Sequence, residues 1–153
     1  MGKSGKADRR ALPPDYKGFI DRYGLGRIAE FVSIFTPFSG NRHANLGQQA
    51  QVQSEALREL GDMLGALPTF PMFPAPAGLL SFGGTDNGDI LFWRTEGRPQ
   101  DWSIVIGEAR GPVREIHAGP MTALLADYLA GRIATDIMPS IKAGLTAFRR
   151  VPD

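Results

Sequence analysis

The chain has 153 residues, a usual length for one domain with a single hydrophobic core. Its hydrophobic fraction of 42% and charged fraction of 22% are typical of a globular protein, and the absence of cysteine excludes disulfides, thiolate metal sites and a cysteine nucleophile. The net charge of +1 arises from residues 1–10, which carry four basic side chains and one acidic one, so the rest of the chain is about −2 and lacks the basic excess of nucleic-acid-binding domains.

The domain organisation follows from this charge pattern. Residues 1–10 are predicted to be a flexible basic tail, and residues 11–153 a single domain. No apolar run approaches the roughly 18 residues that cross a bilayer, and the N-terminus lacks the apolar segment of a secretory signal. We therefore expect a cytoplasmic protein that binds neither nucleic acid nor membrane.

The first predicted element is a helix in LPPDYKGFIDRYG, with Pro13 or Pro14 in its first turn and Gly24 at its end. Its apolar positions recur at helical spacing and are expected to face the core: Tyr16, Phe19, Ile20 and Tyr23. The next segment, RIAEFVSIFTP, is rich in β-branched and aromatic residues, which predicts one strand. A second helix is expected from about Asn45 to Leu67.

A proline-rich segment, LPTFPMFPAPAG, follows the second helix. Its prolines at positions 68, 71, 74 and 76 exclude a helix and favour extended backbone. Because Phe70, Met72 and Phe73 are costly to leave in water, we expect a packed connection within the domain. A proline-rich recognition motif is the alternative.

The second half of the chain predicts an antiparallel meander, because short gaps join successive strands as hairpins. The strands are expected at about Leu79–Phe82, Asp89–Arg94, Ser103–Gly107 and Val113–Ala118. GPMTALLADYLAGRI then predicts a helix between Pro120 and Gly131, and a short or broken helix is expected from Asp136 to Phe148. The fold class is therefore α+β, with a mostly antiparallel sheet of about 4–6 strands flanked by helices.

The loop GGTDNG matches neither of two ligand-binding patterns. A phosphate loop would lead into a helix, whereas Gly83, Gly84 and Gly88 precede a β-rich run. A calcium loop would need acids or amides at alternating positions, and this order is missing. Asn87-Gly88 instead predicts a type I′ hairpin turn, in which both residues have positive φ.

No catalytic or metal centre is predicted, and no cofactor is expected. His43 and His117 have no partner at metal-ligand spacing, and no nucleophile motif supports a Ser-His-Asp triad. Four acids at strand ends are expected to be solvated: Glu96, Asp101, Glu108 and Glu115. Trp93 and Trp102 are expected to pack in the core or across strands.

The order of three segments resembles the SUKH superfamily, which includes bacterial immunity proteins and the fungal Smi/Knr regulators of cell-wall synthesis. The segments are LPPDYKGFIDRYGLG, LLSFGGTDNGDILFWRTEGRPQDWSIVI and AGPMTALLADYLAGRI. The matching positions are Leu12, Pro13, Tyr16, Gly83, Gly84, Asn87, Gly88, Asp89, Trp93, Pro99, Asp101, Trp102, Leu125, Leu129 and Gly131. The match ends near residue 133, Met121 stands where the family more often has phenylalanine, and the chain is less acidic than many of the family's immunity proteins.

The resemblance implies a non-catalytic protein that neutralises a cognate polymorphic toxin, often a nuclease, by occluding its active site. Such a protein needs a complementary surface and a few buried anchors. We then expect binding through the sheet and its hairpin loops. The acids expected to pair with basic toxin residues are Asp86, Asp89, Glu96, Asp101 and Glu108, with Trp93 and Trp102 supporting the surface.

Two alternatives from other classes remain. The first is a scaffold or regulator, as in the fungal relatives, or an adaptor in a defence system, with no toxin partner. The second is an enzyme, which a bound metal or two carboxylates converging with His117 in a deep pocket would favour. Oligomeric state is not predicted by the sequence.

Overall fold

The computed structural model describes residues 12–24, 26–64, 71–108, 114–139 and 148–150, and gives the backbone alone at 57, 58 and 60–64. The predicted basic tail lies outside these ranges. Within them, the elements are α1 (Pro14–Tyr23), β1 (Gly26–Ile28), β2 (Val32–Ile34), α2 (Leu46–Leu64), β3 (Leu79–Thr85), β4 (Ile90–Arg94), the 3₁₀ helix η2 (Pro99–Asp101), β5 (Ser103–Gly107), β6 (Arg114–His117), α3 (Met121–Leu129) and β7 (Phe148–Arg150).

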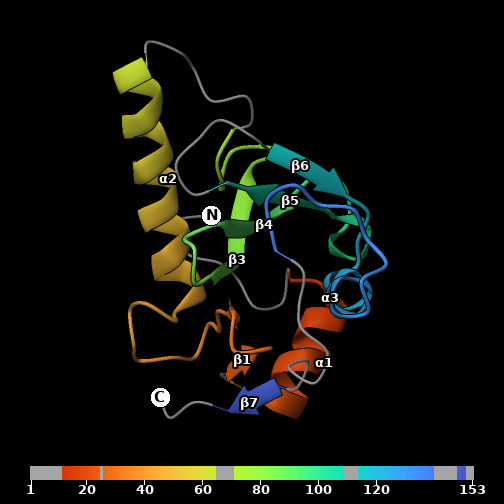
Figure 1. Ribbon diagram of the computed structural model, residues 1–153. Coiled ribbons are helices and arrows are strands. Elements are labelled where there is room, and N and C mark those ends of the chain that lie inside the picture. The colour runs from red at the N-terminus through yellow and green to blue at the C-terminus, as the bar shows by residue number, and fades with distance from the viewer. Residues whose placement is uncertain (1–11, 25, 65–70, 109–113, 140–147, 151–153) are drawn as a thin grey trace.

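The strands form one seven-stranded sheet in the order β6-β5-β4-β3-β2-β1-β7. Every pairing is antiparallel, so the predicted α+β meander is confirmed. β7 departs from the simple meander because it returns to pair with β1, and the first and last strands therefore lie side by side (Figure 1). α2 runs beside β3, and α1 and α3 lie together at the other side of the sheet (Figure 1).

The segment predicted as one strand is two, β1 and β2, joined by a tight turn. Ala29 and Glu30 have φ of 57° and 55°, and the Phe31 N–H donates to the Ile28 carbonyl at 3.0 Å. Positive φ is uncommon for residues other than glycine and asparagine. No turn-forming residue marks the reversal, so the continuous apolar pattern wrongly indicated a single strand.

The turn between β3 and β4 also differs from the predicted type I′ form. Gly88 has a φ of 89°, whereas Asn87 is not among the described residues with positive φ. Gly83 and Gly84 lie within β3 rather than in the turn. A Cβ on Gly83 would lie 2.7 Å from the Ser33 carbonyl oxygen, so this glycine allows β2 to approach β3 closely.

The three predicted helices are present, whereas most of the short or broken helix predicted from Asp136 to Phe148 lies outside the described residues. α2 begins after Asn45, whose side-chain oxygen accepts the Gln48 N–H at 3.0 Å as a cap; residues 65–67 of its predicted range lie outside the described residues. Residues 136–139 are not helical, residues 140–147 lie outside the described ranges, and Phe148 begins β7.

The proline-rich segment is described from residue 71 onward, and that part packs against the core as predicted. Met72 forms a β-bridge with Leu79, and Phe73 is half-buried against the main core. Phe70 and Pro68 lie outside the described residues.

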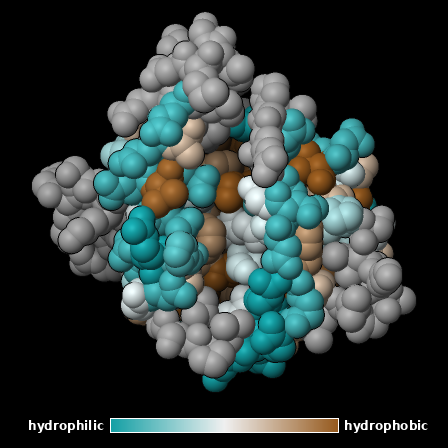
Figure 2. Space-filling view, turned by 60° about the vertical axis from the view of Figure 1, so that its left-hand side comes forward, coloured by the Kyte–Doolittle hydropathy of each residue, from teal (hydrophilic) through white to brown (hydrophobic). Residues whose placement is uncertain are grey.

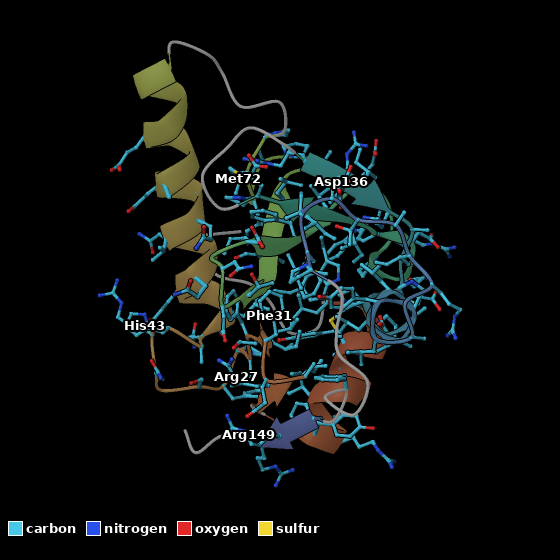
Figure 3. The ribbon with its side chains drawn as sticks, in the orientation of Figure 1. Arg27, Phe31, His43, Met72, Asp136 and Arg149 are labelled. Carbon is cyan, nitrogen blue, oxygen red and sulfur yellow. The ribbon has the colours of Figure 1, made fainter. Side chains whose placement is uncertain are left out.

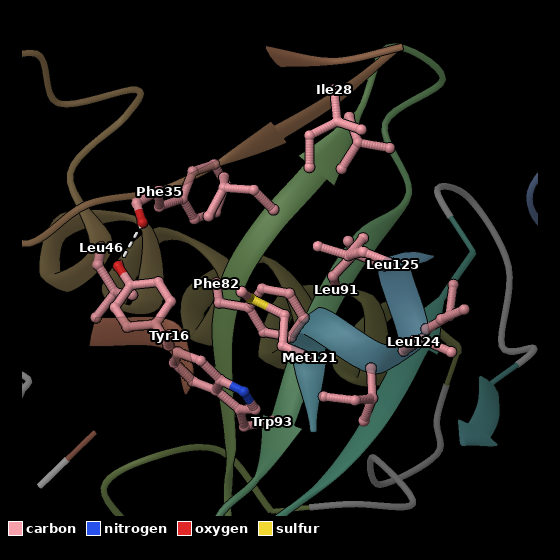
Figure 4. Close-up of a cluster of buried hydrophobic side chains, with 14 of the residues drawn as sticks. Tyr16, Ile28, Phe35, Leu46, Phe82, Leu91, Trp93, Met121, Leu124 and Leu125 are labelled. Carbon is pink, nitrogen blue, oxygen red and sulfur yellow. Dashed lines mark hydrogen bonds between the residues drawn. The ribbon is translucent and has the colours of Figure 1, made fainter. Parts of the chain in front are cut away.

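An aromatic cluster joins α1 to the sheet (Figure 4). The Trp93 ring is 1% exposed and meets Tyr16 edge-on at 4.9 Å, Phe82 at 4.7 Å and Trp102 at 5.9 Å between ring centres. The Tyr16 hydroxyl donates to the Phe35 carbonyl oxygen at 2.5 Å. Trp102 Nε1 donates to the Gly97 carbonyl oxygen at 3.1 Å, so the indole N–H has an acceptor while the ring stays buried.

We predict that Tyr16→Phe destabilises the fold, because it leaves the buried Phe35 carbonyl without this donor while keeping the ring. The expected loss in free energy of unfolding is about 1–3 kcal/mol. Tyr23→Phe is the matched control, since Tyr23 is 37% exposed, and should change stability by less than about 0.5 kcal/mol. Denaturant unfolding followed by tryptophan fluorescence measures both, and equal midpoints for the two variants would contradict the assigned role of Tyr16.

Candidate partner-binding surface

The five acids predicted to contact a partner are divided between two ends of the sheet. β4 runs from the Thr85–Asp89 turn to Arg94, and β5 returns in register, with Ile90 opposite Gly107. Asp86, Asp89 and Glu108 therefore lie at one end of these strands, and Glu96 and Asp101 at the other. A five-residue strand separates the ends by roughly 15 Å. The structure does not bring the five acids into one patch.

Asp86 and Asp89 differ sharply in exposure although both flank the same turn. The Arg27 guanidinium binds both Asp86 carboxylate oxygens, at 2.7 and 2.8 Å, on the surface. Asp89 is only 5% exposed, and its Oδ2 accepts the Thr85 hydroxyl at 3.2 Å. Asp89 is thus part of the turn's internal bonding, which corrects the expectation that it contacts a partner.

The acids at the opposite end also have partners within the chain. Arg98 pairs with Asp101 at 3.2 Å and Arg94 approaches Glu96 at 3.6 Å. Exposed pairs of this kind contribute only about 0–1 kcal/mol, so a partner's cation could displace them at little cost.

Glu108, at the same end as Asp86, is half-buried beside Arg114. Burial lowers the pKa of Arg114, and the Glu108 carboxylate opposes that shift.

A groove of about 670 Å³ lies between α1 and α3 and is closed at one end by β7. Its walls are largely apolar and include three aromatic rings. Phe19 lies 5.0 Å from Tyr23 and 5.7 Å from Phe148, and Tyr23 lies 5.1 Å from Phe148, between ring centres. Leu125 and Leu129 of α3 form the opposite wall.

Small residues keep the groove open, and a contact between the helices fixes its width. A Cβ on Gly18 would meet no atom within 4 Å, and Ala126 also lines the groove. Asp15 of α1 accepts both the backbone N–H and the hydroxyl of Thr122 of α3, at 3.0 and 3.1 Å. This contact ties the two helices together, while the small residues beside it leave space between them.

The rim of this groove carries positive charge. The Arg22 guanidinium lies 5.5 Å from the Tyr23 ring centre, a cation–π distance. Arg150, an exposed residue just outside the groove lining, donates from its guanidinium Nε to the Tyr23 carbonyl oxygen at 3.2 Å. An apolar group with a neighbouring carboxylate would match this surface.

Glu115 was predicted to be solvated, but its side chain hydrogen-bonds β6 to the loop after α3. Its side chain is 17% exposed; Oε1 accepts the Thr135 hydroxyl at 2.6 Å and Oε2 the Asp136 N–H at 2.7 Å. His117 Nε2 lies 3.3 Å from Oε1. Burial raises the pKa of Glu115, but its hydrogen bonds to Thr135, Asp136 and His117 outweigh burial and leave the pKa below its ordinary value.

The His117 site thus contains one contacting carboxylate rather than a converging pair. In the described part of the chain, no group of three or more histidine and acidic side chains is placed to hold a metal ion. None of the helices described is both long and apolar enough to span a membrane. His43 is exposed, and its backbone N–H donates to the side-chain oxygen of Asn41 at 2.9 Å.

Comparison of the chain with protein-family models, with curated proteins and with solved structures finds no match.

Sequence reasoning identified residues of one groove wall but not the groove. Phe19 and Tyr23 were expected to form a buried stripe on the first helix, yet Tyr23 is partly exposed. The missing part is Phe148, which reaches the groove because β7 pairs with β1 across 120 positions of sequence, from Ile28 to Phe148. A pairing between segments so distant leaves no local pattern in the sequence.

We predict that the contribution of Glu115 to stability depends on pH. Its pKa is lower in the folded state, so its carboxylate stabilises the fold above the ordinary pKa of glutamate, and this contribution is lost as pH falls towards the folded-state pKa. Glu115→Gln should lower the free energy of unfolding at pH 7 by about 1–3 kcal/mol, and the difference from the unmodified chain should shrink in acid.

Glu96→Gln is the matched control, because the Glu96 side chain is 65% exposed. Its effect should stay below about 0.5 kcal/mol at every pH. Denaturant unfolding between pH 3 and pH 8 measures these differences. A Glu115→Gln curve that runs parallel to that of the unmodified chain across this range would refute the assigned role.

Proposed function

We propose that the protein is a non-catalytic immunity protein that binds a cognate polymorphic toxin and blocks its active site. The observation that carries the proposal is the open groove between α1 and α3, with its aromatic wall and cationic rim. Apolar surface of this kind is costly to leave in water, and binding sites on proteins are where it is commonly retained. Aromatic and arginine side chains are also the residue types that dominate binding energy at protein interfaces.

The groove suits a protein segment better than a small, fully enclosed ligand. Its volume of about 670 Å³ falls within the range of ligand sites and has room for several apolar side chains. Its two long walls are helices, tied together by Asp15 and Thr122, so the site loses little conformational freedom on binding. We infer that the occupant is an amphipathic segment of the toxin, with apolar anchors and an adjacent acidic residue facing Arg22 or Arg150.

The SUKH-like order of motifs supports the same proposal. Tyr16, Trp93 and Trp102, which carry part of the resemblance, meet in the cluster that places α1 against the sheet. The resemblance implies toxin neutralisation, and the groove adds a surface through which it could occur. Asp86, Glu96, Asp101 and Glu108 stay predicted as outer contacts with basic toxin residues.

Co-expression tests the proposal. The toxin domain encoded by an adjacent gene is expressed with and without this chain, and the proposal predicts that cell growth is restored when both are present. The purified proteins should then form a complex in which the toxin's activity is lost. Continued killing by the toxin, with no complex formed, would contradict the proposal, and stable binding to several cellular proteins without rescue would favour the scaffold or regulator alternative.

We predict that Gly18→Leu blocks this binding without weakening the fold. The leucine side chain enters open space in the groove, and leucine favours a helix by about 0.5–1 kcal/mol over glycine. Affinity for the toxin domain should fall by about 30-fold or more in calorimetric titration. Ala123→Leu, on an exposed position of α3 outside the groove lining, is the matched control and should bind as the unmodified chain does. Equal affinities for the two variants would place the interface elsewhere.

A further inference from the structure

A second surface feature lies far along the chain from the groove, in the loop between β2 and α2. Phe38 in this loop is 62% exposed, more than Tyr23 at 37% or Ile116 at 57%, the other exposed large hydrophobic side chains among the described residues. On the face shown in Figure 2, hydrophilic residues predominate among those coloured and apolar ones gather in small patches. A phenylalanine this exposed is therefore unusual for the surface of this protein.

The loop that carries Phe38 is closed at its base by backbone hydrogen bonds. The Thr36 N–H donates to the Ala44 carbonyl at 2.9 Å, and the Leu46 N–H donates to the Thr36 carbonyl at 2.9 Å. These bonds form the β-bridge between Thr36 and Asn45. The Phe38 N–H also donates to the Thr36 hydroxyl at 3.1 Å, so the backbone that carries the ring is fixed at both sides.

Side-chain amides bond the interior of the loop. Asn45 Nδ2 donates to the Ser39 carbonyl at 2.9 Å, and Gln49 Nε2 donates to the Arg42 carbonyl at 3.0 Å. Ser39 and Gln49 are 5% and 8% exposed, although both are polar. The loop thus has its own buried polar contacts, and Phe38 on it is 62% exposed.

The charged side chain of this loop is basic. Residues 36–45 contain Arg42 and no aspartate or glutamate, and the acids next along the chain are Glu30 and Glu55. Arg42 and His43 are both exposed, and Figure 3 shows His43 on the outer side of the loop, directed away from the sheet. The amino end of α2, which follows the loop, adds partial positive charge of the same sign. A partner that accepts Phe38 would be matched by acidic groups around the contact.

We propose that the loop Thr36–Asn45 is a preformed recognition loop, which inserts Phe38 into an apolar pocket with an acidic rim on the toxin. This inference rests on the proposed function and assigns it a second contact. Because the loop is already ordered, binding needs no further ordering of its backbone, and a single aromatic anchor then contributes strongly to affinity. A protein is the favoured partner because one arginine is too little charge for a phosphate backbone.

Calorimetric titration of the full chain into the purified toxin domain tests the loop. Phe38→Ala should weaken binding by about 30-fold or more, and Phe38→Leu, which keeps an apolar side chain, should recover most of that loss. Ile116→Ala is the matched control, because Ile116 is nearly as exposed and lies on β6; it should bind within about threefold of the unmodified chain. Denaturant unfolding of each variant shows that the fold is kept.

The charge is tested separately by Arg42→Glu, read as an association rate. At low salt this variant should associate about 10-fold more slowly or worse, and the difference should shrink as salt is added. If the unmodified chain binds but Phe38→Ala stays within about threefold of it, the loop assignment is overturned and the proposed function stands. If the unmodified chain does not bind the toxin domain, the proposed function is overturned and the loop assignment with it.

Discussion

The edge-on contact between Tyr16 and Trp93 is the interaction on which the arrangement of the molecule depends. It joins α1 to the centre of the sheet, where Trp93 also meets Phe82 and Trp102. The Tyr16 hydroxyl then bonds the Phe35 carbonyl, one residue before the loop that carries Phe38. One buried cluster therefore positions both the helix that forms a groove wall and the base of the exposed loop. The two candidate contact surfaces are consequences of the same packing.

The contacts proposed at the groove and the loop differ from the acidic contacts that the sequence predicts at the hairpin ends of the sheet. The acids there are split between two ends, one is buried, and others are paired with arginines of the same chain. The groove is instead lined largely by apolar side chains, and the loop exposes one phenylalanine, Phe38, near Arg42. We therefore propose that aromatic and aliphatic contacts supply most of the affinity, with charge setting the orientation and rate of encounter. The proposed partner has apolar anchors beside acidic groups, whereas the resemblance alone suggested a basic partner.

Local sequence patterns were sufficient for much of the fold. The three helices follow from 3.6-residue periodicity, with proline and glycine marking the ends of α1 and α3, and β3 to β6 follow from apolar runs separated by short polar gaps. The β1–β2 reversal was missed because Ala29 and Glu30 adopt positive φ without a turn-forming residue. β7 was missed because its partner is distant in sequence. Asp89 was predicted to contact a partner and Glu115 to be solvated, because the burial of an acidic side chain depends on neighbours, here Thr85 and Thr135, that its own spacing does not reveal.

Hydrogen–deuterium exchange on the complex with the toxin domain would test the central claim most directly, since it locates the interface without altering a residue. We expect binding to add most protection in Thr36–Asn45 and along the facing turns of α1 and α3, with smaller changes in the Thr85–Asp89 turn, where Asp86 is a predicted outer contact. Protection confined to that turn and to the Arg94–Ser103 connection, with the groove and the loop unchanged, would contradict it.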